Sequence, residues 1–318
     1  MALYQQLDDG IVCIDTEQHR PQMAACYLIG GDGHYAFVES GTSLSVPGLL
    51  QTLEALGVER GAVDYVMPTH VHLDHAGGAG ALVRELPNAR LVIHPRGARH
   101  MIDPSQLIAG ATAVYGPEAM RATYGEIQPV PESRVVVADV APDRDFELML
   151  GERRLQFIDA PGHARHHYAI WDEASRGWFT GDVFGLVYRE FDTAEAHYLI
   201  PTTSPVQFDP GAWNATLDRL LERSPTHVYL THYGCVDAVP ALADDLREGL
   251  VAYQRIARRH ADAPDRHVRI HSALMAYHLD QLRARRHPMA EARARELLDM
   301  DVEINTQGLE IWLDRQRG

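Results

Sequence analysis

Lysine is absent from this 318-residue chain, so all 29 of its cationic side chains are arginines. The absence excludes a lysine Schiff base and the lysine of a phosphate-binding P-loop. The 44 acidic residues bring the formal net charge to -15, which argues against general polyanion binding without excluding a local basic site. We therefore expect a small-molecule substrate and no nucleic-acid partner.

Cysteine and long hydrophobic runs are also scarce. Cys13, Cys26 and Cys235 lie far apart, which excludes a disulfide framework and a thiolate metal site and favours buried apolar side chains. No apolar run approaches the roughly 18 residues of a membrane span. The N-terminus lacks a basic region followed by an apolar one, so we expect a cytoplasmic protein without membrane association.

Histidine, in contrast, is abundant and clustered. The chain has 18 histidines, and residues 69–78 read THVHLDHAGG, directly after a predicted strand over residues 63–67. In extended chain, alternate residues point the same way, so His70 and His72 can bind one ion, while Asp74 and His75 enter a glycine-rich turn and face a second. Imidazole nitrogens with carboxylate oxygens suit zinc, iron or manganese.

Three later segments repeat this arrangement, each with a polar residue after a short apolar strand. The strand over residues 155–158 leads into Pro161-Gly162-His163, the strand before Gly181 leads into Asp182, and residues 228–230 lead into Thr231-His232. Each placement alone is typical of a turn or cap residue. Together they predict that several strands deliver metal ligands to one edge of a sheet.

Short strands and helices alternate through the first 240 residues, which predicts helices layered outside sheets. Residues 101–130 form a helical or irregular insertion. Beyond Pro240 we expect three or four helices and no strand. We therefore divide the chain into a catalytic domain over residues 1–240 and a helical segment over 241–318 packed on it. An apolar C-terminal stretch around Trp312 leaves a homodimer open.

The order HxHxDH, PGH, GD and TH resembles that of the metallo-β-lactamase fold superfamily over roughly residues 10–240, and within it the glyoxalase II-like branch. The resemblance implies an α/β fold, an αββα sandwich with a two-metal site at one edge, here followed by a C-terminal helical extension. It also implies the ligand roles. His70, His72 and His163 hold the first metal, Asp74, His75 and His232 hold the second, and Asp182 bridges them.

Two positions distinguish this chain within that family. Asp182 stands where the cysteine-containing lactamases place a cysteine. The early strand usually ends in Asp-Thr-Gly, whereas this chain has Glu39-Ser40-Gly41, which we expect to alter the packing behind the ligands without touching one.

Two neighbouring cations can share a water, lower its pKa toward about 7 and hold it as a bridging hydroxide. Asp74 is then the residue that orients this water or accepts its proton. We expect a hydrolase of small ester-type substrates, a thioester or a lactone, with two divalent ions, zinc first and iron or manganese next. The alternative is an iron-dependent oxygen-binding or sulfur-oxidising protein. A nuclease or phosphodiesterase is disfavoured by the charge.

Residues near the predicted ligands are candidates for binding substrate. Phe184 and Tyr188 follow Asp182 and line a cleft in this interpretation, with ordinary core packing as the alternative. Tyr233 follows His232, and its hydroxyl is placed to donate to a developing oxyanion. His166 and His167 either support a ligand or lie at the surface.

Overall fold

The structure is a computed structural model that describes residues 3–193 and 196–317. The chain forms two compact units. The first comprises the residues up to Ala160 together with His166–Gly181 and Ser224–Asp237. The second comprises Pro161–Arg165, Asp182–Arg223 and the chain from Ala238 onward.

The first unit contains two mixed sheets. In spatial order, the strands of the larger sheet are β1 (Tyr4–Gln6), β2 (Ile11–Asp15), β3 (Ala25–Gly31), β4 (His34–Val38), β5 (Val63–Met67), β6 (Arg90–Ile93) and β7 (Val135–Val137). Those of the smaller sheet are β13 (Gly234–Val236), β12 (His227–Leu230), β11 (Gly177–Phe179), β10 (Tyr168–Asp172), β9 (Arg153–Asp159) and β8 (Phe146–Leu150).

Strand direction explains why polar residues gather at one edge of each sheet. From β4 to β7 the neighbouring strands are parallel, so the ends of β4 and β5, followed by Glu39 and Thr69, lie at the same edge. In the smaller sheet, β9 and β11 are both antiparallel to β10, and β11 is parallel to β12. The carboxyl ends of β9, β11 and β12 therefore also share an edge.

Apolar side chains fill the space between the two sheets. Tyr27 and Phe157 come from opposite sheets and are both buried in this core. Hydrogen bonds also join the sheets, because the Tyr27 hydroxyl donates to the Leu230 carbonyl at 2.5 Å and the Tyr168 hydroxyl to the Val92 carbonyl at 2.9 Å. The sandwich thus holds the ends of strands from both sheets in fixed positions.

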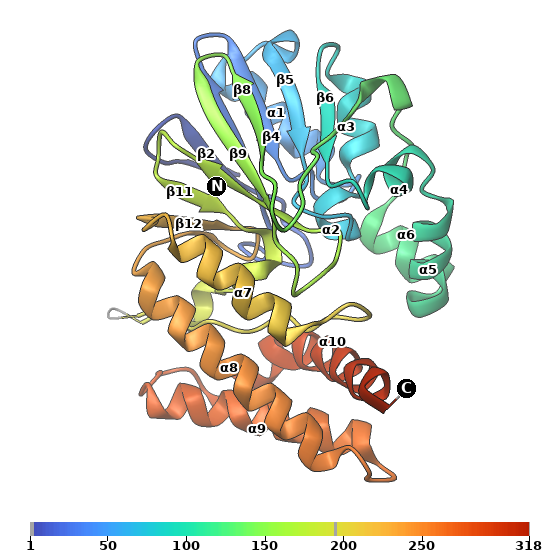
Figure 1. Ribbon diagram of the computed structural model, residues 1–318, viewed down its shortest axis with the longest axis vertical. Coiled ribbons are helices and arrows are strands. Elements are labelled where there is room, and N and C mark those ends of the chain that lie inside the picture. Colours follow the sequence, from blue (N-terminus) through green and yellow to red (C-terminus); the bar gives the residue numbers. More distant parts are fainter. Residues whose placement is uncertain (1–2, 194–195, 318) are drawn as a thin grey trace. The chain divides into compact units, whose positions relative to one another are not determined.

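Helices cover the outer face of the larger sheet (Figure 1). The first, α1, begins with a proline in its first turn and ends at Gly57, whose φ of 69° is left-handed and suits glycine. The helices of this unit are α1 (Val46–Leu56), η1 (Arg60–Ala62), α2 (Leu73–Ala76), α3 (Ala79–Glu85), α4 (Ala98–Ile102), α5 (Ser105–Tyr115), α6 (Pro117–Tyr124) and η2 (Glu132–Arg134).

The second unit is built from helices and the loops between them. Its elements are η3 (Gly181–Phe184), η4 (Arg189–Phe191), α7 (Pro210–Leu221), α8 (Val239–His260), α9 (Arg266–Ala284) and α10 (Glu291–Arg317). The described part of the chain after Pro240 is helical, as expected. The predicted α/β sandwich with C-terminal helices is therefore confirmed.

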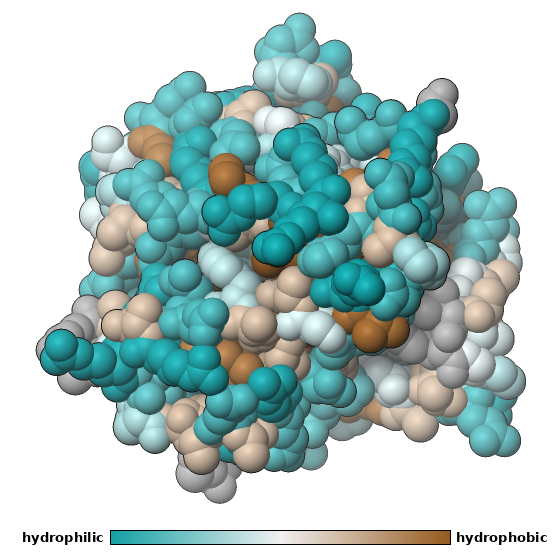
Figure 2. Space-filling view, turned by 90° about the horizontal axis from the view of Figure 1, so that it is seen from below, coloured by the Kyte–Doolittle hydropathy of each residue, from teal (hydrophilic) through white to brown (hydrophobic). Residues whose placement is uncertain are grey.

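The hydrophilic side chains of the surface (Figure 2) and the burial of two cysteines follow the composition of the chain. Figure 2 shows one face on which hydrophilic residues predominate and hydrophobic ones are scattered. Within the described residues, no helix has the length and apolar character needed to cross a membrane. Cys13 and Cys26 are buried, and burial, with the charge of Glu39 adding to it, raises the pKa of the Cys26 thiol.

Candidate metal centre

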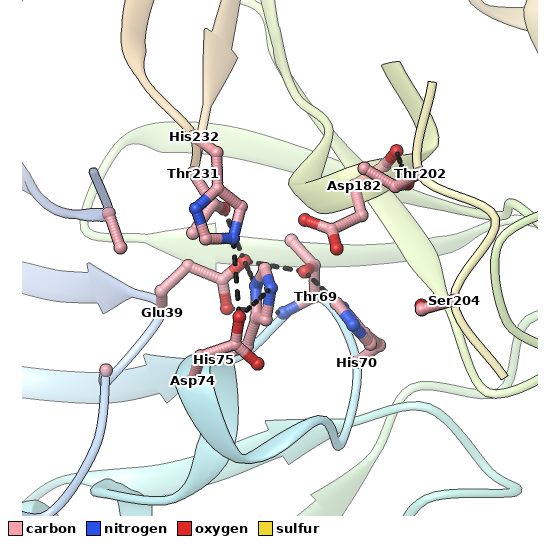
Figure 3. A network of polar contacts seen from close by, with 12 residues as sticks. Glu39, Thr69, His70, Asp74, His75, Asp182, Thr202, Ser204, Thr231 and His232 are labelled. Atoms are coloured by element: carbon pink, nitrogen blue, oxygen red, sulfur yellow. Dashed lines mark hydrogen bonds and ion pairs between the residues drawn. The ribbon is translucent and has the colours of Figure 1, made fainter. Parts of the chain in front are cut away.

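Asp74, His75 and His232 form one group of candidate ligands within the first unit. Their ligand atoms lie within 4.8 Å of one another. His232 follows β12, whereas Asp74 and His75 lie in the one-turn helix α2 rather than entering a glycine-rich turn, which corrects that detail of the expectation. Asp74 Oδ2 is 3.5 Å from His75 Nε2 and 3.3 Å from His232 Nε2 (Figure 3).

Glu39 supports this group from behind. Its side chain is 1% exposed, and its Oε1 accepts hydrogen bonds from His75 Nδ1 at 3.0 Å, the Thr69 hydroxyl at 2.6 Å and the Thr231 hydroxyl at 3.0 Å. Its Oε2 accepts the Thr69 backbone N–H at 3.0 Å (Figure 3). We expected this position to leave the ligands untouched, and that expectation is wrong, because the longer glutamate side chain reaches the ring of His75.

The hydrogen bonds also determine which nitrogen of each ring carries its proton. His232 Nδ1 lies 2.8 Å from the Met23 carbonyl, which only accepts, so Nδ1 must donate. The Thr69 hydroxyl donates to Glu39 and therefore accepts from His70 Nδ1 at 3.1 Å. In each neutral ring, Nε2 is left with its lone pair.

His70 and His72 form a second group of candidate ligands in the first unit. Their ligand atoms lie within 4.8 Å of each other, and their rings meet edge to face with centroids 4.4 Å apart. His167 is fully buried and stacks on His70 at 4.7 Å, and His166 meets His72 edge to face at 5.5 Å. Both members of the His166-His167 pair therefore pack against candidate ligands.

His163 and Asp182 lie together within the second unit, with His163 Nε2 3.4 Å from Asp182 Oδ2. His163 Nδ1 donates to the Thr202 carbonyl at 3.0 Å, so its Nε2 also keeps a lone pair. Gly162, at a φ of 141°, allows this turn, since an added Cβ there would lie 2.5 Å from Trp213 atoms.

These contacts fit a cation bound between the imidazoles and the carboxylates. In each contact a lone pair on Nε2 faces a carboxylate oxygen at 3.3–3.5 Å, and a cation bound between the two atoms would satisfy both. Two ligands at about 2.1 Å from one tetrahedral ion are themselves about 3.4 Å apart. The donor set and its spacing therefore suit metal ions.

The candidate substrate residues are buried. Phe184 is fully buried, and the Tyr188 hydroxyl donates to Asp301 Oδ1 on α10 at 3.1 Å. Tyr233 is 9% exposed and belongs to the core between the sheets. Their assignment to substrate binding stays a prediction.

Sequence reasoning placed Glu39 behind the ligands but missed its hydrogen bond to His75, and it missed the roles of three threonines. Two of the threonines stand directly before a histidine, Thr69 before His70 and Thr231 before His232. This repeated Thr-His pair at two strand ends is the sequence signal that could have identified Thr69 and Thr231. Thr202 carries no comparable mark in the sequence.

Comparison with known proteins places the chain in a family. The sequence profile of the metallo-beta-lactamase superfamily matches residues 19–232. Metallo-beta-lactamase fold-containing protein ST1585 of Sulfurisphaera tokodaii is 27% identical over 219 residues, which cover 68% of this chain and 75% of that protein.

Solved structures share the fold at lower identity. The metallo-beta-lactamase family protein TTHA1429 of Thermus thermophilus matches with a TM-score of 0.68 and 20% identity, over 97% of this chain and 94% of that one. The chemotaxis sensor ODP, solved as a peroxy diiron species, matches with a TM-score of 0.52 and 14% identity, over 77% and 93%. The profile covers well over half of the chain, which therefore belongs to the metallo-beta-lactamase superfamily.

Proposed function

We propose that the protein is a binuclear-metal-dependent hydrolase of small ester-type substrates, thioesters or lactones, of the glyoxalase II-like kind. His70, His72 and His163 hold one ion, Asp74, His75 and His232 hold the other, and Asp182 bridges the two. The observation that carries the proposal is the spacing of 3.3–3.5 Å between imidazole Nε2 atoms and carboxylate oxygens in both units.

Chain continuity supports combining ligands from the two units. Asp182 is bonded directly to Gly181 of the first unit, and His163 lies three residues after Ala160 and three before His166. A residue adds at most about 3.6 Å to the reach of a chain, so both side chains are tethered near the ends of β9 and β11. Those ends share their sheet edge with the end of β12, which His232 follows.

If bound by these residues, a pair of ions would lower the pKa of a shared water toward about 7 and would polarise the carbonyl of the substrate. Asp74 has the access to take part, since 26% of its side chain is exposed while its Oδ2 faces His75 and His232. We assign Asp74 the orientation of this water and the acceptance of its proton. Tyr233, next to His232, is proposed to donate from its hydroxyl to the developing oxyanion.

Zinc is the metal we propose, with iron or manganese as the next candidates. The ligand separations near 3.4 Å match a tetrahedral ion, and imidazole with carboxylate is a common zinc set. The same donors also bind iron, and the fold is shared with a chemotaxis sensor solved as a peroxy diiron species. An iron-dependent oxygen-binding protein is therefore the alternative that the metal measurement tests.

The experiment measures metal content and turnover on the same preparation. Protein expressed without added metal is assayed by elemental analysis and visible absorption, then with a thioester, a lactone and a phosphodiester. We expect two ions per chain and turnover of an ester-type substrate. Turnover of the phosphodiester alone, or a coloured iron protein that hydrolyses none of the three, would contradict the proposal.

Substitution of the bridging carboxylate tests the assignment of Asp182. An amide of the same shape has no negative charge to offset two dications, so Asp182→Asn should weaken both ions and lower turnover by at least about 100-fold. The matched control, Asp299→Asn, changes an exposed residue of α10 and should retain both ions. If Asp182→Asn binds two ions tightly and keeps near-parental turnover, Asp182 is a turn residue and not the bridging ligand.

A further inference from the structure

We propose that Asn305 and Gly308 of α10 are positioning residues for His163 and Asp182. The C-terminal helix lies outside residues 19–232, which the family profile matches, so the family does not imply this role. The inference rests on the proposed function in taking His163 and Asp182 as metal ligands. All the contacts that carry it lie within the second unit.

Asn305 holds the chain on both sides of Thr202. It is 3% exposed, and its Oδ1 accepts hydrogen bonds from the Thr203 backbone N–H and, at 3.1 Å, from the Thr203 hydroxyl. Its Nδ2 donates to the Pro201 carbonyl at 3.0 Å. One buried amide therefore fixes the residue before Thr202 and the residue after it.

Thr202 in turn contacts both candidate ligands. Its carbonyl accepts from His163 Nδ1 at 3.0 Å, which leaves Nε2 of that ring to face Asp182. Its hydroxyl donates to the Asp182 backbone carbonyl at 3.2 Å (Figure 3). The orientation of the His163 ring and the position of the Asp182 backbone thus both depend on where Thr202 lies.

Gly308 allows α10 to approach this segment closely. A Cβ on Gly308 would lie 1.5 Å from the Thr203 carbonyl oxygen, whereas ordinary contact begins at 3.4 Å, so an alanine must push the two apart by about 2 Å. From α8, Gly249 also faces Pro201, where an added Cβ would lie 2.8 Å from the proline ring. Two helices therefore confine residues 201–203.

The composition of α10 favours a specific role over general packing. Asparagine and glycine are both poor helix formers, and glycine costs about 1 kcal/mol relative to alanine in a helix interior. Asn305 and Gly308 are three residues apart, so they share one face of α10, and both contact Thr203. The helix thus carries two unfavourable residues at the place where it meets the segment that orients the ligands.

The first experiment is a metal titration of full-length variants. Asn305→Ala and Gly308→Ala should each lower the affinity for the ion at His70, His72 and His163 by at least 10-fold. The affinity for the ion at Asp74, His75 and His232 should fall by less, because Asp182 is the one ligand of that ion that the substitutions displace. Gly110→Ala is the matched control, because Gly110 is also helical but an added Cβ meets nothing within 4 Å. Folded variants that bind both ions with parental affinity would overturn the proposal.

A second measurement needs no metal. In the metal-free parent protein, NMR of the imidazole nitrogens should find the proton of His163 on Nδ1, and in Asn305→Asp, a variant of equal size without the donor to Pro201, this preference should weaken. A proton on Nε2 in the parent would overturn the proposal even if the alanine variants fail to fold. Failure of the parent to bind a second ion would instead contradict the proposed function, and the NMR result would still decide the positioning role.

Discussion

Glu39 links residues that come from three separate strand ends. It follows β4, its partners Thr69 and His75 lie after β5, and Thr231 follows β12 of the other sheet. Its φ of 66° is left-handed, an unfavourable backbone conformation for a side chain of this size. The chain accepts this cost where one buried carboxylate satisfies several donors, which is typical of a position under functional constraint.

Glu39→Gln should weaken metal binding by about 10-fold to 100-fold, the range found when a partner behind a ligand is lost. The amide group keeps one acceptor and turns a donor toward residues that donate, so the network cannot be satisfied. The cost to stability should be about 1–3 kcal/mol. Glu59→Gln, at an exposed glutamate, is the control, and metal titration with denaturant unfolding measures both effects. Unchanged metal affinity in Glu39→Gln would contradict the role of Glu39.

The sequence pattern points to the candidate ligands, whereas it does not point to the hydrogen bonds behind them. His70, His72, Asp74 and His75 lie within six residues, so their spacing alone is unusual. The bond between Thr231 and Glu39 joins residues 192 positions apart and exists only because two sheets pack face to face. A contact set by that packing leaves no local pattern in the chain.

His278 is the buried titratable residue from which we expect a pH effect. Tyr198 and Tyr253 hydroxyls lie 2.6 Å from its two nitrogens, the Tyr277 ring packs beside it, and Arg285 lies over the Tyr198 ring. Burial lowers the pKa of His278 to about 3. The folded protein therefore keeps this imidazole neutral at mildly acidic pH.

The unfolded chain binds a proton at this histidine below about pH 6.5, and the folded chain does not. The contribution of the neutral His278 ring to the free energy of unfolding is therefore fully present above that pH. It falls as the pH drops toward 3, and the loss is about 2 kcal/mol at pH 5. In His278→Gln, the free energy of unfolding should therefore fall less between pH 7 and pH 5, and the difference from the parent should be about that amount. Denaturant unfolding in chelator, which removes the pH dependence of metal binding, measures it. A parental pH dependence in His278→Gln would be inconsistent with this explanation.

Elements with a clear apolar period were predicted well. The strand expected over residues 63–67 has the bounds of β5, and those expected over 155–158 and 228–230 lie within β9 and β12, because each has a run of apolar residues closed by a turn residue. The elements that were not expected are short. They include β1 and β13, three residues each, and α2, a single turn that carries Asp74 and His75. Tertiary contacts rather than local propensity form such elements.

The start of α7 gives a prediction at the scale of one element. Asp209 is its N-cap, and its side chain accepts from the backbone N–H groups of Gly211 and Ala212, both at 3.0 Å. Its own N–H donates to the Gly162 carbonyl at 2.8 Å, next to His163. Asp209→Ala should lower the free energy of unfolding by about 1 kcal/mol, and Asp209→Asn by much less, because asparagine also caps helices. Equal losses in the two variants, measured by denaturant unfolding, would exclude capping as the cause.

At the scale of the whole chain, sequence order and spatial grouping differ. The expected division at residue 240 follows the last predicted strand, whereas contacts group Asp182–Arg223 with the C-terminal helices. The chain enters the second unit briefly at Pro161–Arg165 and again at Asp182, the segments that carry His163 and the bridging candidate. A single boundary along the sequence cannot describe such a grouping, because it depends on which segments pack together.

Metal removal tests how the fold and the centre depend on each other. The sheets of the first unit have their own apolar core, so the metal-free protein should keep its secondary structure. Ions that bind only the folded state should raise the free energy of unfolding by about 2.7 kcal/mol per site when the free metal concentration is 100 times Kd. His70→Ala should stay folded and lose the stabilisation by the first ion. Circular dichroism and thermal unfolding, with and without chelator, measure both effects. Unfolding on chelation, or thermal stability independent of metal, would contradict this account.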